Sequence, residues 1–132
     1  MSYSNPERIQ YAMPAVTSVT AAATIATING PKGKAGRIAD IVAHVTTTHV
    51  LGSSAQTKLN VGHGSGGDLT AMASYATPAA TAGAQLSATR VAGALKTGFR
   101  LPADTAVLVN TIANAGGSAA GVISYTVVID WF

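Results

Sequence analysis

The stretch of residues 62–67 has a spacing that is typical of phosphate-binding loops. It reads Gly-His-Gly-Ser-Gly-Gly, matches G-x-G-x-x-G and follows a predicted strand. A dinucleotide site also needs a long helix that begins at the last glycine, and an acidic residue about 20 positions later for the ribose. Pro78 interrupts the next segment too early, and no Asp or Glu occurs between Asp68 and Asp104. We therefore interpret the stretch as a loop between strands and predict no cofactor.

The same loop contains Ser65, which could act as a nucleophile in a G-x-S-x-G elbow. That motif requires glycine where His63 stands, so the match fails at its first position. His44 and His49 are five residues apart, which would place them on opposite faces of one strand, where they cannot share a metal ion. The acidic residues are scattered, at Glu7, Asp40, Asp68, Asp104 and Asp130. We predict no metal site, no catalytic residues and no enzymatic activity.

One basic cluster, Lys32, Lys34 and Arg37, lies in and beside a glycine-rich turn. The formal net charge of the chain is only +3, and no aromatic residue stands near the cluster to stack on bases. We therefore predict no nucleic-acid partner. A solubilising turn, or a salt-sensitive contact with an acidic protein surface, explains the cluster more simply.

The composition limits the kind of domain that can hold these residues. Of the 132 residues 48% are hydrophobic, but 26 residues are alanine and only 5% of the chain is aromatic. Because an alanine buries little apolar area, we expect a thin core and further stabilisation by self-association. Charged residues make up 10%, which disfavours long solvated helices. Cysteine is absent, and this excludes disulfides and thiol chemistry.

The sequence predicts neither a membrane span nor a secretory signal. The longest unbroken apolar run, residues 106–109, is far shorter than the roughly 18 residues that a span requires. The first eight residues also lack a basic start followed by an apolar stretch. We therefore expect no membrane partner.

Short segments rich in β-branched residues, separated by Gly, Pro and Asn, predict an all-β fold. The clearest segment is 123–131, in which apolar and polar residues alternate. Residues 37–45 fit both helical and strand spacing, and we favour a strand because glycine precedes them and threonines follow. Further strands are predicted at residues 16–20, 24–28, 57–61 and 105–112. About seven or eight such segments indicate a single-domain β-sandwich of the jelly-roll type.

Two connections and one end of the chain complete this interpretation. Residues 114–118 have turn composition, which predicts an antiparallel hairpin between residues 105–112 and the terminal strand. Residues 69–82 could hold one helical turn capped by Asp68. Residues 1–14 show no clear period and contain two prolines, so we predict an extended N-terminal arm before a domain over residues 15–132. The alternative is that this segment packs onto its own domain.

Four stretches carry a resemblance to a known family. They are residues 36–42 (Gly-Arg-Ile-Ala-Asp-Ile-Val), the glycine loop 61–68, residues 101–107 (Leu-Pro-Ala-Asp-Thr-Ala-Val) and the terminal residues 127–132. Over residues 36–132 the chain resembles the small capsid decoration, or cement, proteins of tailed bacteriophages. The resemblance implies a jelly-roll domain that forms trimers on the outside of the phage head and bridges subunits of the major capsid protein.

The expected function is therefore that of a virion structural protein on the outer capsid surface, made in the host cytoplasm and acting as a homotrimer. We expect the arm to become ordered only against a neighbouring subunit or capsid protein. The large apolar side chains near the two ends of the chain are the candidate contacts with capsid or subunit: Tyr3, Tyr11, Met13, Trp131 and Phe132. The alternative is a receptor- or carbohydrate-binding head module of a phage fibre or spike, for which His63 and Tyr75 are the only candidates on predicted loops.

Overall fold

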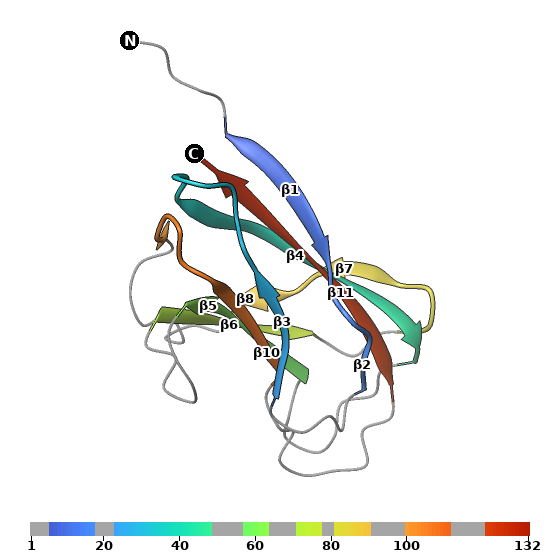
Figure 1. The fold of residues 1–132 in the computed structure, drawn as a ribbon. Helices are drawn as coiled ribbons and strands as arrows, with labels where there is room; N and C mark the ends of the chain where they lie inside the picture. The colour runs from blue at the N-terminus through green and yellow to red at the C-terminus, as the bar shows by residue number, and fades with distance from the viewer. Residues whose placement is uncertain are drawn as a thin grey trace.

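The computed structural model describes residues 6–17, 23–48, 57–63, 71–77, 81–90, 100–111 and 121–132. The regular elements in these ranges are all strands, and they form two antiparallel sheets that pack against each other (Figure 1). Sheet A contains β1 (Glu7–Ala12), β2 (Val16–Thr17), β4 (Gly36–Thr47), β7 (Gln85–Ser87), β9 (Arg100–Leu101) and β11 (Val122–Trp131). Sheet B contains β3 (Ala23–Ile28), β5 (Thr57–His63), β6 (Ala71–Thr77), β8 (Thr89–Arg90) and β10 (Val107–Thr111). The predicted all-β sandwich is confirmed.

The strand pairing is nested, like a long hairpin folded over on itself. β5 pairs with β6, β4 with β7, β3 with β10 and β1 with β11, so each pair encloses the previous one in the sequence. Successive pairs alternate between the two sheets and give the orders β1-β11-β4-β7 and β3-β10-β5-β6. This is the strand order of a jelly roll. The short strands β8 and β9 add to β6 and β4.

Strand β11 lies at the centre of sheet A and supplies much of the core. It pairs with β4 over ten positions and with β1 over six. Its side chains alternate between the two faces, and those that face sheet B are fully buried: Ile123, Tyr125, Val127, Ile129 and Trp131. In β4 the fully buried side chains are Ile41, Ala43 and Val45. This period of two confirms both predicted strands and excludes the helical interpretation of residues 37–45.

A buried hydrogen bond links the two sheets. The hydroxyl of Tyr125 in β11 lies 2.6 Å from Oγ1 of Thr77 in β6. Both residues are at most 1% exposed, so each hydroxyl satisfies the other in a place that water does not reach. Burial raises the pKa of the Tyr125 hydroxyl, although the bond to Thr77 acts in the opposite direction. The hydroxyl end of Tyr125, a large core side chain of sheet A, is therefore held against sheet B.

The predicted hairpin between residues 105–112 and the terminal strand is wrong. Strand β10 pairs with β3 and β5 in sheet B, whereas β11 pairs with β1, β2 and β4 in sheet A. Both strands are central in their sheets, so each one has partners on both edges and neither has an edge left for the other. Residues 112–120, which contain the predicted turn, lie outside the described residues.

The suggested helical turn within residues 69–82 is also wrong where the structure describes it. Residues Ala71–Thr77 form strand β6, which pairs with all seven residues of β5. The physical reason is that β5 already pairs with β10 on one side and needs a partner for the backbone groups of its other edge. Small Ala, Thr and Ser residues have no strong preference of their own, so the neighbouring strand decides their conformation.

The interpretation of residues 1–14 as an arm requires correction over residues 7–13. Strand β1 pairs with the outer edge of β11, from Glu7 opposite Trp131 to Ala12 opposite Thr126. The Met13 N–H continues the contact with a 2.9 Å bond to the Tyr125 carbonyl. An uncovered β11 would expose a row of backbone donors and acceptors, and β1 satisfies them. The segment thus packs onto its own domain without a neighbouring subunit, while residues 1–5 lie outside the described residues.

Trp131 closes one end of the sandwich beneath the turn between β3 and β4. Ala35 and Phe132 exchange two backbone hydrogen bonds of 2.9 and 3.0 Å, which extend the β4–β11 ladder past the indole. A Cβ added at Gly36 would lie 2.7 Å from Cζ3 of Trp131, and one added at Gly30 would overlap the same six-membered ring. Two glycines therefore let the backbone of the turn approach the ring directly.

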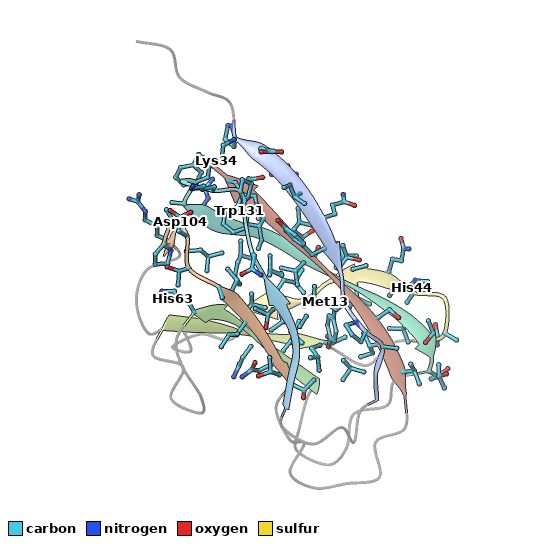
Figure 2. All side chains as sticks on the ribbon, viewed as in Figure 1. Met13, Lys34, His44, His63, Asp104 and Trp131 are labelled. Atoms are coloured by element: carbon cyan, nitrogen blue, oxygen red, sulfur yellow. The ribbon has the colours of Figure 1, made fainter. Side chains whose placement is uncertain are left out.

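An acidic side chain from another loop holds this turn in place. Gly33 has a φ of +77°, and its N–H donates to Oδ1 of Asp104 at 2.8 Å. Figure 2 shows Asp104, Lys34 and Trp131 gathered at the same end of the sandwich. The β9–β10 loop is therefore bonded to the β3–β4 turn at the end of the core that Trp131 fills.

The glycine at position 30 is expected to be required only because the indole lies against it. Gly30→Ala should lower the free energy of unfolding by about 1–3 kcal/mol, the usual cost of overpacking, as measured by urea denaturation. In a Trp131→Phe background the smaller ring should make Gly30→Ala nearly neutral. Gly33→Ala is the control, because no atom lies within 4 Å of the added methyl and its cost comes from the positive φ. An equal cost of Gly30→Ala in both backgrounds would contradict this explanation.

The burial of the Tyr125 hydroxyl predicts a specific loss of stability in alkali. The folded state holds the pKa of Tyr125 above its ordinary value of 10.0, so the unfolded chain releases this proton first. The stabilisation is complete below pH 10 and declines as the pH rises above it. Tyr125→Phe should be destabilised by about 1–3 kcal/mol at pH 7, because Thr77 loses its partner, and the difference from wild type should shrink above pH 10.

Urea denaturation at pH 7, 10 and 11 measures both effects. Thr77→Val is the matched control, because it removes the same hydrogen bond and keeps the titrating phenol. This control should retain an alkaline decline at least as steep as that of the wild type. A Tyr125→Phe protein that declines as steeply as the wild type would show that this group is not responsible.

Candidate functional site

Four charged residues from neighbouring strands form one row across the outer face of sheet A. The register pairs Arg8 of β1 with Asp130 of β11, Asp130 with Arg37 of β4, and Arg37 with Arg100 of β9. Residues directly opposite one another in antiparallel strands share a face. Asp130 alternates with the buried Trp131, so this face points away from sheet B. Because neighbouring strands lie about 4.8 Å apart, the row spans about 14 Å.

Arg8 and Asp130 form a bidentate pair within this row. Nε of Arg8 lies 2.7 Å from Oδ1 and Nη2 lies 3.0 Å from Oδ2. The side chain of Arg8 is 63% exposed and that of Asp130 only 11%, so the arginine covers the carboxylate. Hydrogen bonding by Arg8 lowers the pKa of Asp130, against the effect of burial, and the charges of Arg8 and Arg37 add to the lowering. A single guanidinium thus engages both oxygens of Asp130.

Arg37 and Arg100 are exposed, and neither forms an ion pair with any described carboxylate. Arg37 lies close enough to Asp130 to affect its pKa but makes no hydrogen bond to it. Asp40, on the same strand as Arg37, accepts the N–H of the next residue at 2.8 Å and the hydroxyl of Ser87 at 3.1 Å. Two like charges therefore stand opposite each other on β4 and β9, and neither forms an ion pair among the described residues.

An exposed aromatic side chain adjoins the row. Phe132 is 48% exposed and is the only large apolar side chain so exposed in the described ranges. It is two residues beyond Asp130 on an extended chain, which places it in line with Asp130 on the same face. Its backbone pairs with Ala35, the residue two positions before Arg37. The outer face of sheet A thus presents a cationic pair beside an apolar ring.

The basic cluster predicted around the β3–β4 turn is divided by the fold. Nζ of Lys34 lies 3.2 Å from Oε2 of Glu7, at the start of β1, so its charge is used within the domain. Lys32 is exposed on the turn, and Arg37 belongs to the row on sheet A. Arg37 is therefore the only one of these three cations that lies in a sheet and also lacks an ion-pair partner among the described residues.

The five residues predicted as capsid or subunit contacts have different positions. Trp131 and Met13 are only 1% and 9% exposed, so they belong to the core and the prediction for them is wrong. Tyr11 is half-buried, and its hydroxyl accepts the Trp131 Nε1–H at 3.0 Å. Tyr3 lies outside the described residues. Phe132 alone combines an aromatic ring with a described exposed position, and its role as a contact stays a prediction.

The residues of the rejected chemical motifs lie mainly in β5 and β4 or beyond the described ranges. Gly62 and His63 end strand β5, while the rest of the glycine loop and His49 are outside the described residues. His44 is half-buried in β4 between Ser124 and Gln85. The described ranges hold no cluster of three or more His, Asp or Glu side chains suited to a metal ion. Nor does any described segment form a helix that could cross a membrane.

Sequence reasoning missed Arg8, Asp130 and Arg100 as members of a common site. The alternation of residues 123–131 does place Asp130 on the outer face, and this was the available signal. The partners of Asp130 come from segments more than 90 residues earlier, and only the register reveals them. Comparison with models of protein families, with curated proteins and with solved structures finds no match to this chain.

The pair between Arg8 and Asp130 predicts a loss of stability in acid. Because the folded state lowers the pKa of Asp130, the pair stabilises the domain above the ordinary carboxylate range near pH 4 and ceases to do so as the pH falls through the lowered value. Asp130→Asn should therefore be less stable than the wild type at pH 7, and the difference should diminish as the pH falls below 4. Urea denaturation across this range measures it.

A double-mutant cycle provides the control for this prediction. Arg8→Gln should cause a similar loss at pH 7, and the double variant should be no worse than either single variant, because both changes remove the same contact. Additive losses would mean that the two side chains stabilise the domain independently and would contradict the paired geometry as the source.

Proposed function

We propose that this chain is a virion structural protein that decorates a tailed-bacteriophage capsid and stabilises it by bridging subunits of the major capsid protein. The observation that carries the proposal is the outer face of sheet A, with its exposed Arg37, Arg100 and Phe132. The resemblance of residues 36–132 to capsid decoration proteins supports it. The jelly-roll fold is frequent among virion proteins, which is an argument by analogy.

A sheet face suits attachment to a regular lattice because its side chains are held in fixed positions. Arg37 and Arg100 stand on strands that are paired within the sheet, and the Phe132 backbone is bonded on both its N–H and its C=O. A surface that is organised before binding loses little conformational entropy when it meets its partner. Decoration of this kind requires binding and no chemical step.

Self-association as a homotrimer is part of the proposal. Among the fully buried hydrophobic side chains of the described residues only Trp131 and Tyr125 are aromatic, and the rest are aliphatic. A core of this kind gains from additional burial between copies. An oligomer with several identical contact faces also gains avidity for a repeating lattice, so weak individual contacts suffice.

Binding to phage heads tests the proposed function directly. The purified chain is mixed with expanded heads assembled from the major capsid protein encoded with it, and co-sedimentation and electron cryomicroscopy measure occupancy. We expect saturable density on the outer surface at sites where capsid subunits meet, and greater resistance of the heads to heat. Heads that already carry the protein should take up no more. Absence of binding at micromolar concentration would overturn the proposal.

Light scattering of the free protein tests the trimer separately. We expect a mass about three times the 13.1 kDa of one chain at micromolar concentration. A monomer at that concentration would contradict self-association in solution.

A further inference from the structure

We infer that Arg37 and Arg100, together with Phe132, form a docking site for an acidic segment of a partner protein. The inference rests on the proposed function, because it takes that partner to be the surface of the capsid protein. The segment that fits would carry neighbouring Asp or Glu side chains and an apolar residue beside them.

The row contains two like charges for which the isolated domain supplies no ion pair among the described residues. Arg37 and Arg100 are directly opposed across β4 and β9, and like charges in this position destabilise a sheet. Neither has an ion-pair partner among the described residues. Where a fold breaks a local rule without compensation, a functional site is the expected reason. Carboxylates placed above the two guanidinium groups would remove the repulsion and form charge-assisted hydrogen bonds.

Arg8 leaves Arg37 and Arg100 free to bind a partner protein, although Arg8 itself need not contact that partner. Asp130 lies between Arg8 and Arg37 in the row and is the carboxylate best placed to neutralise Arg37. The two hydrogen bonds from Arg8 engage both of its oxygens. Both side-chain hydrogen bonds of Asp130 thus come from β1, and Arg37 donates none to it, so the donors of Arg37 remain available to an external group. Arg8 is in this sense a positioning residue.

Protein carboxylates fit this surface better than the phosphates of a nucleic acid. Two cations of the row, Arg37 and Arg100, lack an ion pair among the described residues, and the carboxylates of Asp130 and Asp40 lie on the same face. A polyphosphate backbone would meet those acids as it continued along the sheet. Phe132 adjoins the cations and offers an apolar contact, as the core of a protein interface does.

The same heads and three single-charge variants test the inference. Arg37→Gln and Arg100→Gln should each weaken binding to heads about tenfold, which corresponds to about 1.4 kcal/mol. Lys32→Gln is the matched control, because it removes one exposed cation at the same end of the molecule but outside the row. It should change binding less than about twofold. Binding should also weaken with added salt, and less steeply in the two arginine variants than in the control.

Arg8→Gln separates the docking geometry from simple loss of charge. The Arg8→Gln variant frees Asp130 to pair with Arg37, and it should weaken binding about as much as Arg37→Gln does. If binding depended only on the net charge of the protein, Arg8→Gln would have the smaller effect of Lys32→Gln. Arg8→Lys should have an intermediate effect, since it keeps the charge and loses the bidentate geometry. Near-equal binding of the wild type, Arg37→Gln and Arg100→Gln would overturn the inference even where the wild type binds heads well.

A second measurement does not depend on heads. The wild-type protein, labelled with ¹⁵N and ¹³C, is titrated with the synthetic peptide Asp-Glu-Leu-Asp-Glu, and its uncharged counterpart Asn-Gln-Leu-Asn-Gln is the control. The Nε–H signals of Arg37 and Arg100 and the ring signals of Phe132 should move with the first peptide only. Movement confined to other parts of the molecule would overturn the inference. So would a short oligothymidylate that moves the same signals at lower concentration, because it would assign the site to nucleic acid. Failure of head binding with a positive titration would remove the capsid as partner and leave the acidic site.

Discussion

Sheet A depends on the ten-position ladder between β4 and β11. This pairing places the buried side chains of both strands on one face, where they meet sheet B, and fixes which residues stand on the other face. A shift of one residue would turn Trp131 outward and Asp130 inward, because side chains alternate along a strand. The outer strands β1 and β9 then attach to positions that the ladder has already determined. The charged row is therefore a product of the same register that fills the core.

Local alternation predicted the strands well because burial on one face imposes a period of two on the sequence itself. Residues 123–131 and 57–61 were identified in this way, and β4 was distinguished from a helix by its flanking residues. Which strands pair with each other is not recorded in any such local pattern of the sequence. The turn composition of residues 114–118 predicted a hairpin between β10 and β11, yet the nested pairing puts the two strands in different sheets. The N-terminal segment was interpreted as an arm because strand β1 has only a weak pattern and gains its structure from β11.

The residues of the candidate site also could not be predicted from local sequence patterns alone. Trp131 and Met13 were assigned to the surface for their position near the ends of the chain, although the alternation that identified the last strand also puts Trp131 on the buried side. Arg8, Asp130, Arg37 and Arg100 come from four strands, so only the pairing of those strands shows that they are neighbours. The glycines beside Trp131 likewise can be understood only from the three-dimensional structure. The indole of Trp131 fills one end of the sandwich because glycine at positions 30 and 36 leaves the space for it.

Nested pairing also determines when the domain can form during synthesis. Arg8 and Asp130 lie 122 residues apart in the chain, and the strands that carry them are partners. Strands β1 and β4 leave the ribosome long before β11, which must lie between them, so sheet A has no stable form until β11 has been translated. Until then β1 and β4 expose unpaired edges that another nascent chain could cover. The interval between translation of β4 and of β11 is therefore the period in which these edges are most open to aggregation.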